Sequence, residues 1–212
     1  MLVVAPSRNW VRQVRRFVQP PSVPRCEVCG TAIPEDHAHL VDIAERRLLC
    51  ACRACTAIPS RGGPFRRLPT TTRRLSDVQL SDGEWESLQI PIGLAFVFHS
   101  TPLGRAVALY PGPAGATESL LGLEAWSDLV SRNPRLATLE PDVEALLIDR
   151  TDGRRDYYQV PIDRCYTLVG LMRQHWRGLS GGSEAWTVIA DFFDRLRRNS
   201  VSAGSFTDWA HG

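Results

Sequence analysis

Five of the six cysteines lie within 30 positions of one another, and this cluster constrains the fold more than any other feature of the sequence. Four of them form two Cys-x-x-Cys pairs with 22 residues between the pairs. Two intervening residues let both thiolates of a tight turn bind one ion, and backbone amides of the turn can donate to the sulfurs. Two such pairs about 15–20 residues apart are typical of a zinc ribbon. We therefore predict a four-cysteine metal site with Cys26, Cys29, Cys52 and Cys55 as ligands.

The residues between the two pairs fit the topology of a ribbon. His39–Ile43 and Arg46–Cys50 have the patterns of strands, and Ala44-Glu45 between them predicts a two-residue turn. Gly30 follows the first pair, where such a turn often needs a positive φ. A module of about 30 residues cannot bury enough apolar surface to be stable alone, so a metal ion would hold it together.

Three further residues are alternative ligands. Cys50 and Cys52 are two positions apart and would share one face of a strand. Cys50 could therefore replace Cys52, or lie beneath the site as a small apolar residue. We favour Cys52, because its spacing from Cys55 repeats the first pair. His37 and His39 also point the same way in an extended chain, and they could be ligands, hydrogen-bond donors to the ligands, or solvated residues near a turn.

The donor set bears on the identity of the metal. Four tetrahedral thiolates suit zinc, and they also suit a single iron, as in rubredoxins. Thr56 stands where the second turn of a rubredoxin usually has glycine, and the aromatic packing that rubredoxins usually show is lacking. The sequence therefore favours zinc over iron. A zinc site closed by four protein ligands is structural rather than catalytic.

The patterns along the chain predict five segments. These are a basic amphipathic helix with a Pro linker (1–24), the four-cysteine zinc-ribbon-like module (25–56), a Pro-, Gly- and Arg-rich linker (57–75), an α+β body (76–200) and a tail (201–212). In the body, two hairpins alternate with helices. The hairpins are Gly93–His99 with Arg105–Tyr110, and Glu144–Arg150 with Asp156–Val160 around Asp152-Gly153. The helices are a short one after Ser81, Gly122–Val130, a helix capped by Asp163 that ends near Trp176, and Ser183–Arg198. The expected fold class is α+β, with an N-terminal zinc-ribbon-like module before a body that has a mainly antiparallel sheet.

The body contains no recognisable catalytic motif. There is no nucleophile elbow, no Ser/His/Asp order and no motif of paired carboxylates. Two Gly-rich loops, 111–118 and 178–183, could present backbone amides to an anion, but neither matches a phosphate-binding or dinucleotide-binding fingerprint. His99 and Cys165 are expected to be structural. We predict no catalytic residue, and the sequence favours a protein that is not an enzyme.

Charge is distributed unevenly. Residues 1–75 hold 13 arginines and five acidic residues, whereas residues 76–212 hold 12 arginines and 18 acidic residues. A basic N-terminal part could bind nucleic acid, but the module has few aromatic side chains for stacking on bases and the body is acidic. We therefore expect a protein partner rather than a nucleic acid. No apolar segment is long enough to span a bilayer and no signal peptide is recognisable, so a cytoplasmic location is expected.

Several strings of the sequence resemble an actinobacterial family that is known only as a domain of unknown function. They are Arg15-Arg-Phe-Val18, Cys26-Glu-Val-Cys29, Glu45-Arg-Arg-Leu-Leu-Cys-Ala-Cys-Arg-Ala-Cys55, Ala108-Leu-Tyr-Pro-Gly-Pro-Ala-Gly-Ala-Thr-Glu-Ser119, Leu139-Glu-Pro-Asp-Val-Glu-Ala-Leu-Leu147 and Trp176-Arg-Gly-Leu-Ser-Gly-Gly-Ser-Glu184. Genes of that family tend to lie beside those for an uptake-type nickel–iron hydrogenase. The resemblance implies an accessory, assembly or electron-transfer role with hydrogenase subunits or their maturation proteins, and it implies no catalytic residue.

Three functional hypotheses follow. The first is a non-catalytic accessory protein with a structural zinc ribbon. The second is a rubredoxin-like electron carrier that uses the same cysteines for one iron. The third is a nucleic-acid-binding zinc ribbon.

Overall fold

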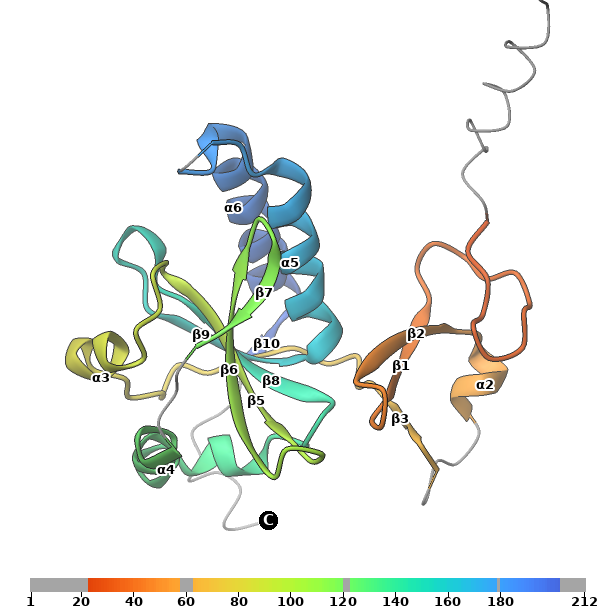
Figure 1. Ribbon diagram of the computed structural model, residues 1–212, viewed down its shortest axis with the longest axis horizontal. Helices are drawn as coiled ribbons and strands as arrows, with labels where there is room; N and C mark the ends of the chain where they lie inside the picture. The colour runs from red at the N-terminus through yellow and green to blue at the C-terminus, as the bar shows by residue number, and fades with distance from the viewer. Residues whose placement is uncertain (1–22, 58–62, 120–122, 179, 203–212) are drawn as a thin grey trace, which may run out of the picture.

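The computed structural model describes residues 23–57, 63–119, 123–178 and 180–202. A small N-terminal sheet with one short helix lies beside a larger body of sheet and helices (Figure 1). The amphipathic helix expected over Ser7–Val18 falls outside the described residues. No helix in the described ranges is both long enough and apolar enough to cross a membrane.

The N-terminal module contains a three-stranded antiparallel sheet with the strand order β2-β1-β3. Its elements are β1 (Ala38–Asp42), β2 (Arg47–Ala51), α2 (Arg53–Ala57) and β3 (Phe65–Arg67). The expected hairpin is present, but its turn has four residues instead of two, because Asp42 pairs with Arg47. Arg46 in this turn has a φ of 52°, and Asp42 Oδ1 accepts a hydrogen bond of 3.1 Å from the Glu45 amide.

The body is built on a seven-stranded sheet with the order β10-β4-β9-β8-β5-β6-β7. All neighbouring strands are antiparallel except β10 and β4, which are parallel. The strands are β4 (Arg73–Arg74), β5 (Leu94–Ser100), β6 (Arg105–Gly112), β7 (Gly115–Glu118), β8 (Glu144–Asp149), β9 (Asp156–Pro161) and β10 (Val201–Ser202). The helices are α3 (Asp82–Ser87), α4 (Leu123–Arg132), α5 (Ile162–His175) and α6 (Gly182–Asn199), with 3-10 turns η1 (Pro134–Thr138) and η2 (Thr151–Gly153). The fold is therefore α+β with mainly antiparallel sheets, as the sequence predicts.

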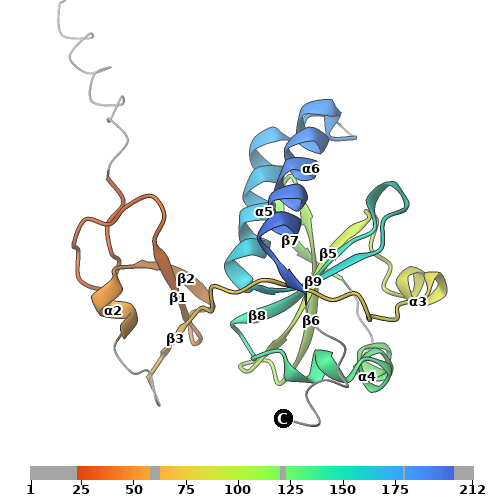
Figure 2. The ribbon, with the colours of Figure 1, turned by 180° about the vertical axis from the view of Figure 1, so that it is seen from behind.

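Helices cover both faces of the body sheet. The pair α5 and α6 packs on one face, where Phe96 of β5 lies in the main core, and Figure 2 shows this pair from behind. The other face packs against α3, α4 and η1 through a second cluster that includes Leu146 of β8. Because side chains alternate between faces, a central strand with both faces covered is apolar at consecutive positions. This explains the uninterrupted apolar runs of β5 and β8, in which nearly every residue is buried.

The start of α3 and the two hairpins of the body lie where the sequence predicts them. Ser81 and Glu84 form a reciprocal capping box at the start of α3. Both body hairpins form at the expected positions, and Asp152 in the turn between β8 and β9 has the positive φ that a tight turn needs.

Two segments expected as loops contain strands instead. Residues 57–75 include β3 and β4, which pair with β1 and β9, and residues 111–118 include β7, which pairs with β6. Pro and Gly in these segments mark turns between short strands, and the strands form because neighbouring edges supply partners for their backbone groups. Leu68 and Leu75 of the first segment are buried in the two main hydrophobic clusters of the body.

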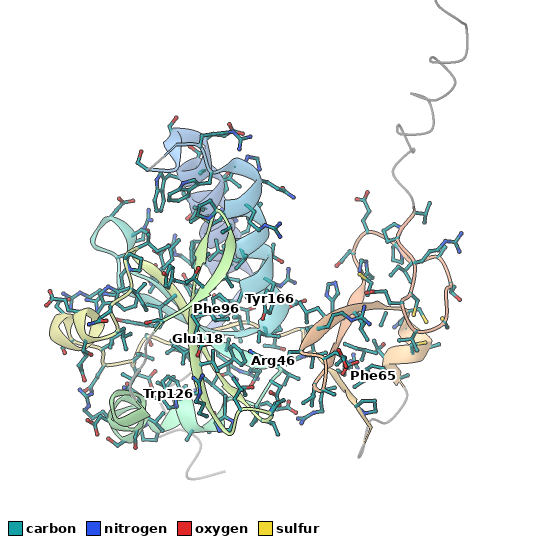
Figure 3. The ribbon with its side chains drawn as sticks, viewed as in Figure 1. Arg46, Phe65, Phe96, Glu118, Trp126 and Tyr166 are labelled. Carbon is teal, nitrogen blue, oxygen red and sulfur yellow. The ribbon has the colours of Figure 1, made fainter. Side chains whose placement is uncertain are left out.

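The module contacts the body through one face of its hairpin. Val41 belongs to the main core of the body, and Ile43 and Leu48 pack against that core. Arg46 of the hairpin turn and Tyr166 of α5 both line a small cavity at this junction (Figure 3). An ion pair between Arg66 and Glu140 also joins the two parts. The junction therefore has an apolar centre with polar contacts beside it.

Candidate metal centre

The first cysteine pair lies in a tight turn closed by backbone hydrogen bonds. The Gly30 amide donates to the Cys26 carbonyl over 2.8 Å, and the Cys26 amide donates to the Thr31 carbonyl over 2.8 Å. Gly30 has a φ of 77°, as the sequence predicts for this position. This conformation costs glycine little, because glycine has no Cβ.

The second cysteine pair begins a helix. The chain leaves Cys52 directly into α2, and the Thr56 amide donates to the Cys52 carbonyl over 3.0 Å. The helical path keeps φ negative, so this turn needs no glycine, and Thr56 is accommodated where the first pair has Gly30. The Cys55 amide lies 3.4 Å from Cys52 Sγ and donates to it, as expected for a metal-binding turn.

The two turns bring four sulfur atoms together. The Sγ atoms of Cys26, Cys29, Cys52 and Cys55 all lie within 4.8 Å of one another, and those of Cys29 and Cys52 are 3.7 Å apart. A tetrahedron with metal–sulfur bonds of about 2.3 Å has an edge of about 3.8 Å. The spacing therefore fits a four-thiolate metal site. Cys26 also belongs to a small apolar cluster with Ile33, Leu40, Leu49 and Ala51, against which Cys52 and Cys55 pack.

The pKa values of three of the thiols are shifted in different directions. Burial opposes ionisation of Cys26, but backbone hydrogen bonds from Cys52, Cys29 and Val28 outweigh it and lower its pKa to about 6. Hydrogen bonds from Thr31 lower the pKa of Cys29. Hydrogen bonds with the neighbouring cysteine sulfurs, first that of Cys52, raise the pKa of Cys55 to about 12. Without a cation the cluster therefore cannot hold four thiolates at neutral pH, whereas a bound metal ion would compensate their charge.

Cys50 belongs to a different group. It lies opposite His39 in the hairpin, and ligand atoms of Cys50, His37 and His39 lie within 4.8 Å of one another. Cys50 does not share a strand face with Cys52 as expected, because β2 ends at Ala51 and the chain turns into α2. The structure thus groups Cys52 with Cys26, Cys29 and Cys55, and it groups Cys50 with the two histidines.

Two carboxylates near these groups were missed by the sequence analysis. Glu27 lies between the first two cysteines, and its Oε2 accepts a hydrogen bond of 2.6 Å from the Cys50 amide. Asp163 was expected to cap α5, but Pro161 occupies the N-cap position, and Asp163 Oδ2 lies 2.9 Å from His39 Nδ1. No local pattern could have revealed the second contact, because 124 positions separate the two residues.

The other candidate residues and loops lie in the body. The loop 111–118 forms the turn between β6 and β7, and the loop 178–183 leads into α6. A Cβ on Gly181 would lie 2.9 Å from the Trp176 ring, so close packing explains the glycine. Cys165 is fully buried in the main core, and this burial raises its pKa well above the usual value. The His99 side chain is exposed at the end of β5.

Comparison with known proteins places the chain in a family. A family model described as a family of unknown function (DUF5947) matches residues 25–200. The chain belongs to this family. The match covers the cysteine module and the body together, so the family is defined by both parts. No curated protein and no solved structure matches the chain.

Proposed function

We propose that Cys26, Cys29, Cys52 and Cys55 hold a structural zinc ion. The observation that supports this most directly is the set of four sulfurs at tetrahedral spacing, with amide donors in both turns. Protein side chains fill all four positions of such a site, which leaves none for a substrate. Among the described residues, the six cysteines are free thiols, and this fits a reducing compartment such as the cytoplasm.

Metal analysis of protein purified from its native host without added metal tests this assignment. We expect zinc and a colourless protein. Iron with thiolate-to-iron absorption that bleaches reversibly on reduction would overturn the zinc assignment and favour a rubredoxin-like electron carrier. The partly exposed position of the cluster, with Cys29 at the surface, is compatible with electron transfer, so the visible spectrum decides between the two metals.

We further propose that the protein is a non-catalytic accessory protein that binds another protein. The support is a four-thiolate site without an open position, together with a module that packs on the body through Val41, Ile43 and Leu48. The module exposes Val23 and Val28, by 62% and 43%, and the exposed Arg25 lies between them in the sequence. Apolar side chains beside arginine are typical of protein interfaces.

The resemblance described above makes an uptake-type nickel–iron hydrogenase the first partner to test. The measurement is affinity capture of purified hydrogenase subunits and of their maturation proteins by the zinc-loaded chain. We expect capture of at least one of these proteins, and we expect it to weaken when Val28 is replaced by Glu. Capture of none of them, or salt-sensitive binding to DNA or RNA in their place, would contradict the proposal.

A further inference from the structure

We infer that His37, His39 and Cys50 form a second metal site, which takes a divalent transition ion of the zinc class and leaves one coordination position open. The inference does not depend on the proposed partner or on the metal in the four-cysteine site. It rests on five observations: the grouping of the three ligands, the hydrogen bonds of both imidazole rings, the buried His37 Nε2 without a partner, the chemistry of the donors and the position of the site at the junction.

The three ligands come together through the hairpin. His39 and Cys50 are directly opposed in the β1–β2 register, and His37 lies two positions before His39. One ligand atom from each residue lies within 4.8 Å of the others, which is the same limit that the four cysteines satisfy. The two imidazole rings lie 4.8 Å apart, edge to face.

Both histidines are held in the tautomer that binds a metal through Nε2. His37 Nδ1 lies 2.8 Å from the Pro34 carbonyl oxygen, and a carbonyl only accepts, so Nδ1 carries the proton. His39 Nδ1 lies 2.9 Å from Asp163 Oδ2, which assigns its proton in the same way. In the neutral rings the lone pairs then lie on Nε2. Metal-binding histidines typically donate their other ring N–H to a backbone carbonyl or a carboxylate, and here one ring does each.

The His37 ring has a buried nitrogen atom without a partner. His37 Nε2 is buried and makes no hydrogen bond with any described residue. A buried polar atom without a partner costs about 1–3 kcal/mol, so such atoms are rare in native proteins. Coordination to an ion held also by His39 and Cys50 would satisfy this atom.

The donor set indicates which ion would bind. Two borderline imidazoles and one soft thiolate suit zinc and its neighbours in the first transition series, and they do not suit calcium or magnesium. Three protein ligands leave the fourth tetrahedral position for solvent or another donor. The His39 side chain is 29% exposed, so solvent can reach the site.

The site lies where the module meets the body. His37, His39 and Cys50 belong to the module, whereas Asp163 belongs to the first turn of α5, and Figure 1 shows the module beside this end of the helix. An ion bound here would fix the His39 ring that contacts Asp163, and it would therefore tighten the junction.

Metal titration of the full-length chain tests the inference. Metal-free protein is titrated with Co²⁺, whose absorption reports thiolate ligands, and zinc content is measured by mass spectrometry. We expect two equivalents per chain. The thiolate-to-cobalt absorption added by the weaker equivalent should be about one quarter of that added by the tighter one, because it involves one thiolate instead of four.

Variants assign the second equivalent. His37→Asn and Cys50→Ser should each bind one equivalent and keep the spectrum of the four-thiolate site. The control is His175→Asn, because His175 also contacts a carboxylate, Glu184, over 2.9 Å but has no second metal-binding neighbour among the described residues. The control should bind two equivalents. A single equivalent in the wild-type chain, or two equivalents in both His37→Asn and Cys50→Ser, would overturn the inference. The wild-type count decides the question even where a variant fails to fold.

Discussion

His39 of β1 and Asp163 of α5 form a hydrogen bond of 2.9 Å between the cysteine module and the body. Their side chains are 29% and 18% exposed, so water screens the contact only in part. The contact lies beside the apolar junction to which Val41 contributes. The four-cysteine module is thus attached to the body by a directed polar contact as well as by apolar packing.

Removal of the Asp163 carboxylate should loosen this junction. Asp163→Ala removes the acceptor for His39 Nδ1, and we expect a loss of about 1 kcal/mol in the free energy of unfolding. Asp163→Asn retains a carbonyl oxygen that can accept, and it should cost less. Urea unfolding of both variants measures the difference, and equal stabilities for the two variants and the wild type would show that the contact contributes nothing.

Metal removal should unfold the module before the body. The apolar cluster of the module has only five buried residues, Cys26 among them, which is too few to hold the turns without an ion. Hydrogen exchange after chelation should show loss of protection at Cys26–Cys29 and Cys52–Cys55, while amides of β5 and β8 keep theirs. Retained protection in both cysteine turns would show that packing against the body holds the module without metal.

Asp156 should make the stability of the body depend on pH in the acid range. Burial alone would raise its pKa, but hydrogen bonds from Arg74 and Arg197, of 2.8 and 3.1 Å, outweigh burial and hold the pKa below its usual value. A pKa lowered by folding means stabilisation that is fully present above the unfolded pKa of about 3.9 and is lost as pH falls through the folded pKa.

Asp156→Asn tests this dependence. The variant should lose about 2 kcal/mol at neutral pH, because hydrogen bonds to a charged group contribute about 1.5–3 kcal/mol each and the amide keeps part of them. The difference from wild type should shrink as pH falls toward 3. Asp152→Asn is the control, because Asp152 is 86% exposed and its ion pair with Arg154 spans 3.7 Å. A pH profile of Asp156→Asn parallel to that of the wild type would assign the acid sensitivity to other groups.

Gly30→Ala should weaken the four-cysteine site without altering its ligands. Nothing lies within 4 Å of the added Cβ, so the cost comes from the φ of 77° alone, and is about 1 kcal/mol. Since 1.4 kcal/mol is a factor of ten, zinc affinity should fall about fivefold. Gly63→Ala is the matched control, because its Cβ also meets nothing within 4 Å and its φ is not in the left-handed region. Competition with a zinc chelator measures both affinities. Equal affinities for the two variants would show that the positive φ of Gly30 does not affect zinc binding.

Patterns of a few neighbouring residues were sufficient to predict many of the helices and strands of this fold. The start of α3 after Ser81 and the hairpin turn at Asp152 follow from local backbone chemistry, so short windows of sequence predicted them. The strands β4 and β7 were missed, because their backbone groups gain partners only from distant strands, β9 and β10 for β4 and β6 for β7. Pro and Gly near them gave the stronger local signal, and that signal indicated loops.

The sequence by itself determined the grouping of Cys26, Cys29, Cys52 and Cys55, because the spacing within each pair sets the geometry of its turn. Only the tertiary structure decided the place of Cys50 and the partner of His39. The end of β2 at Ala51 turns Cys50 away from Cys52, and the packing of α5 brings Asp163 to the hairpin across 124 positions. Contacts of this kind depend on how sheets and helices pack, and no pattern of neighbouring residues encodes that packing.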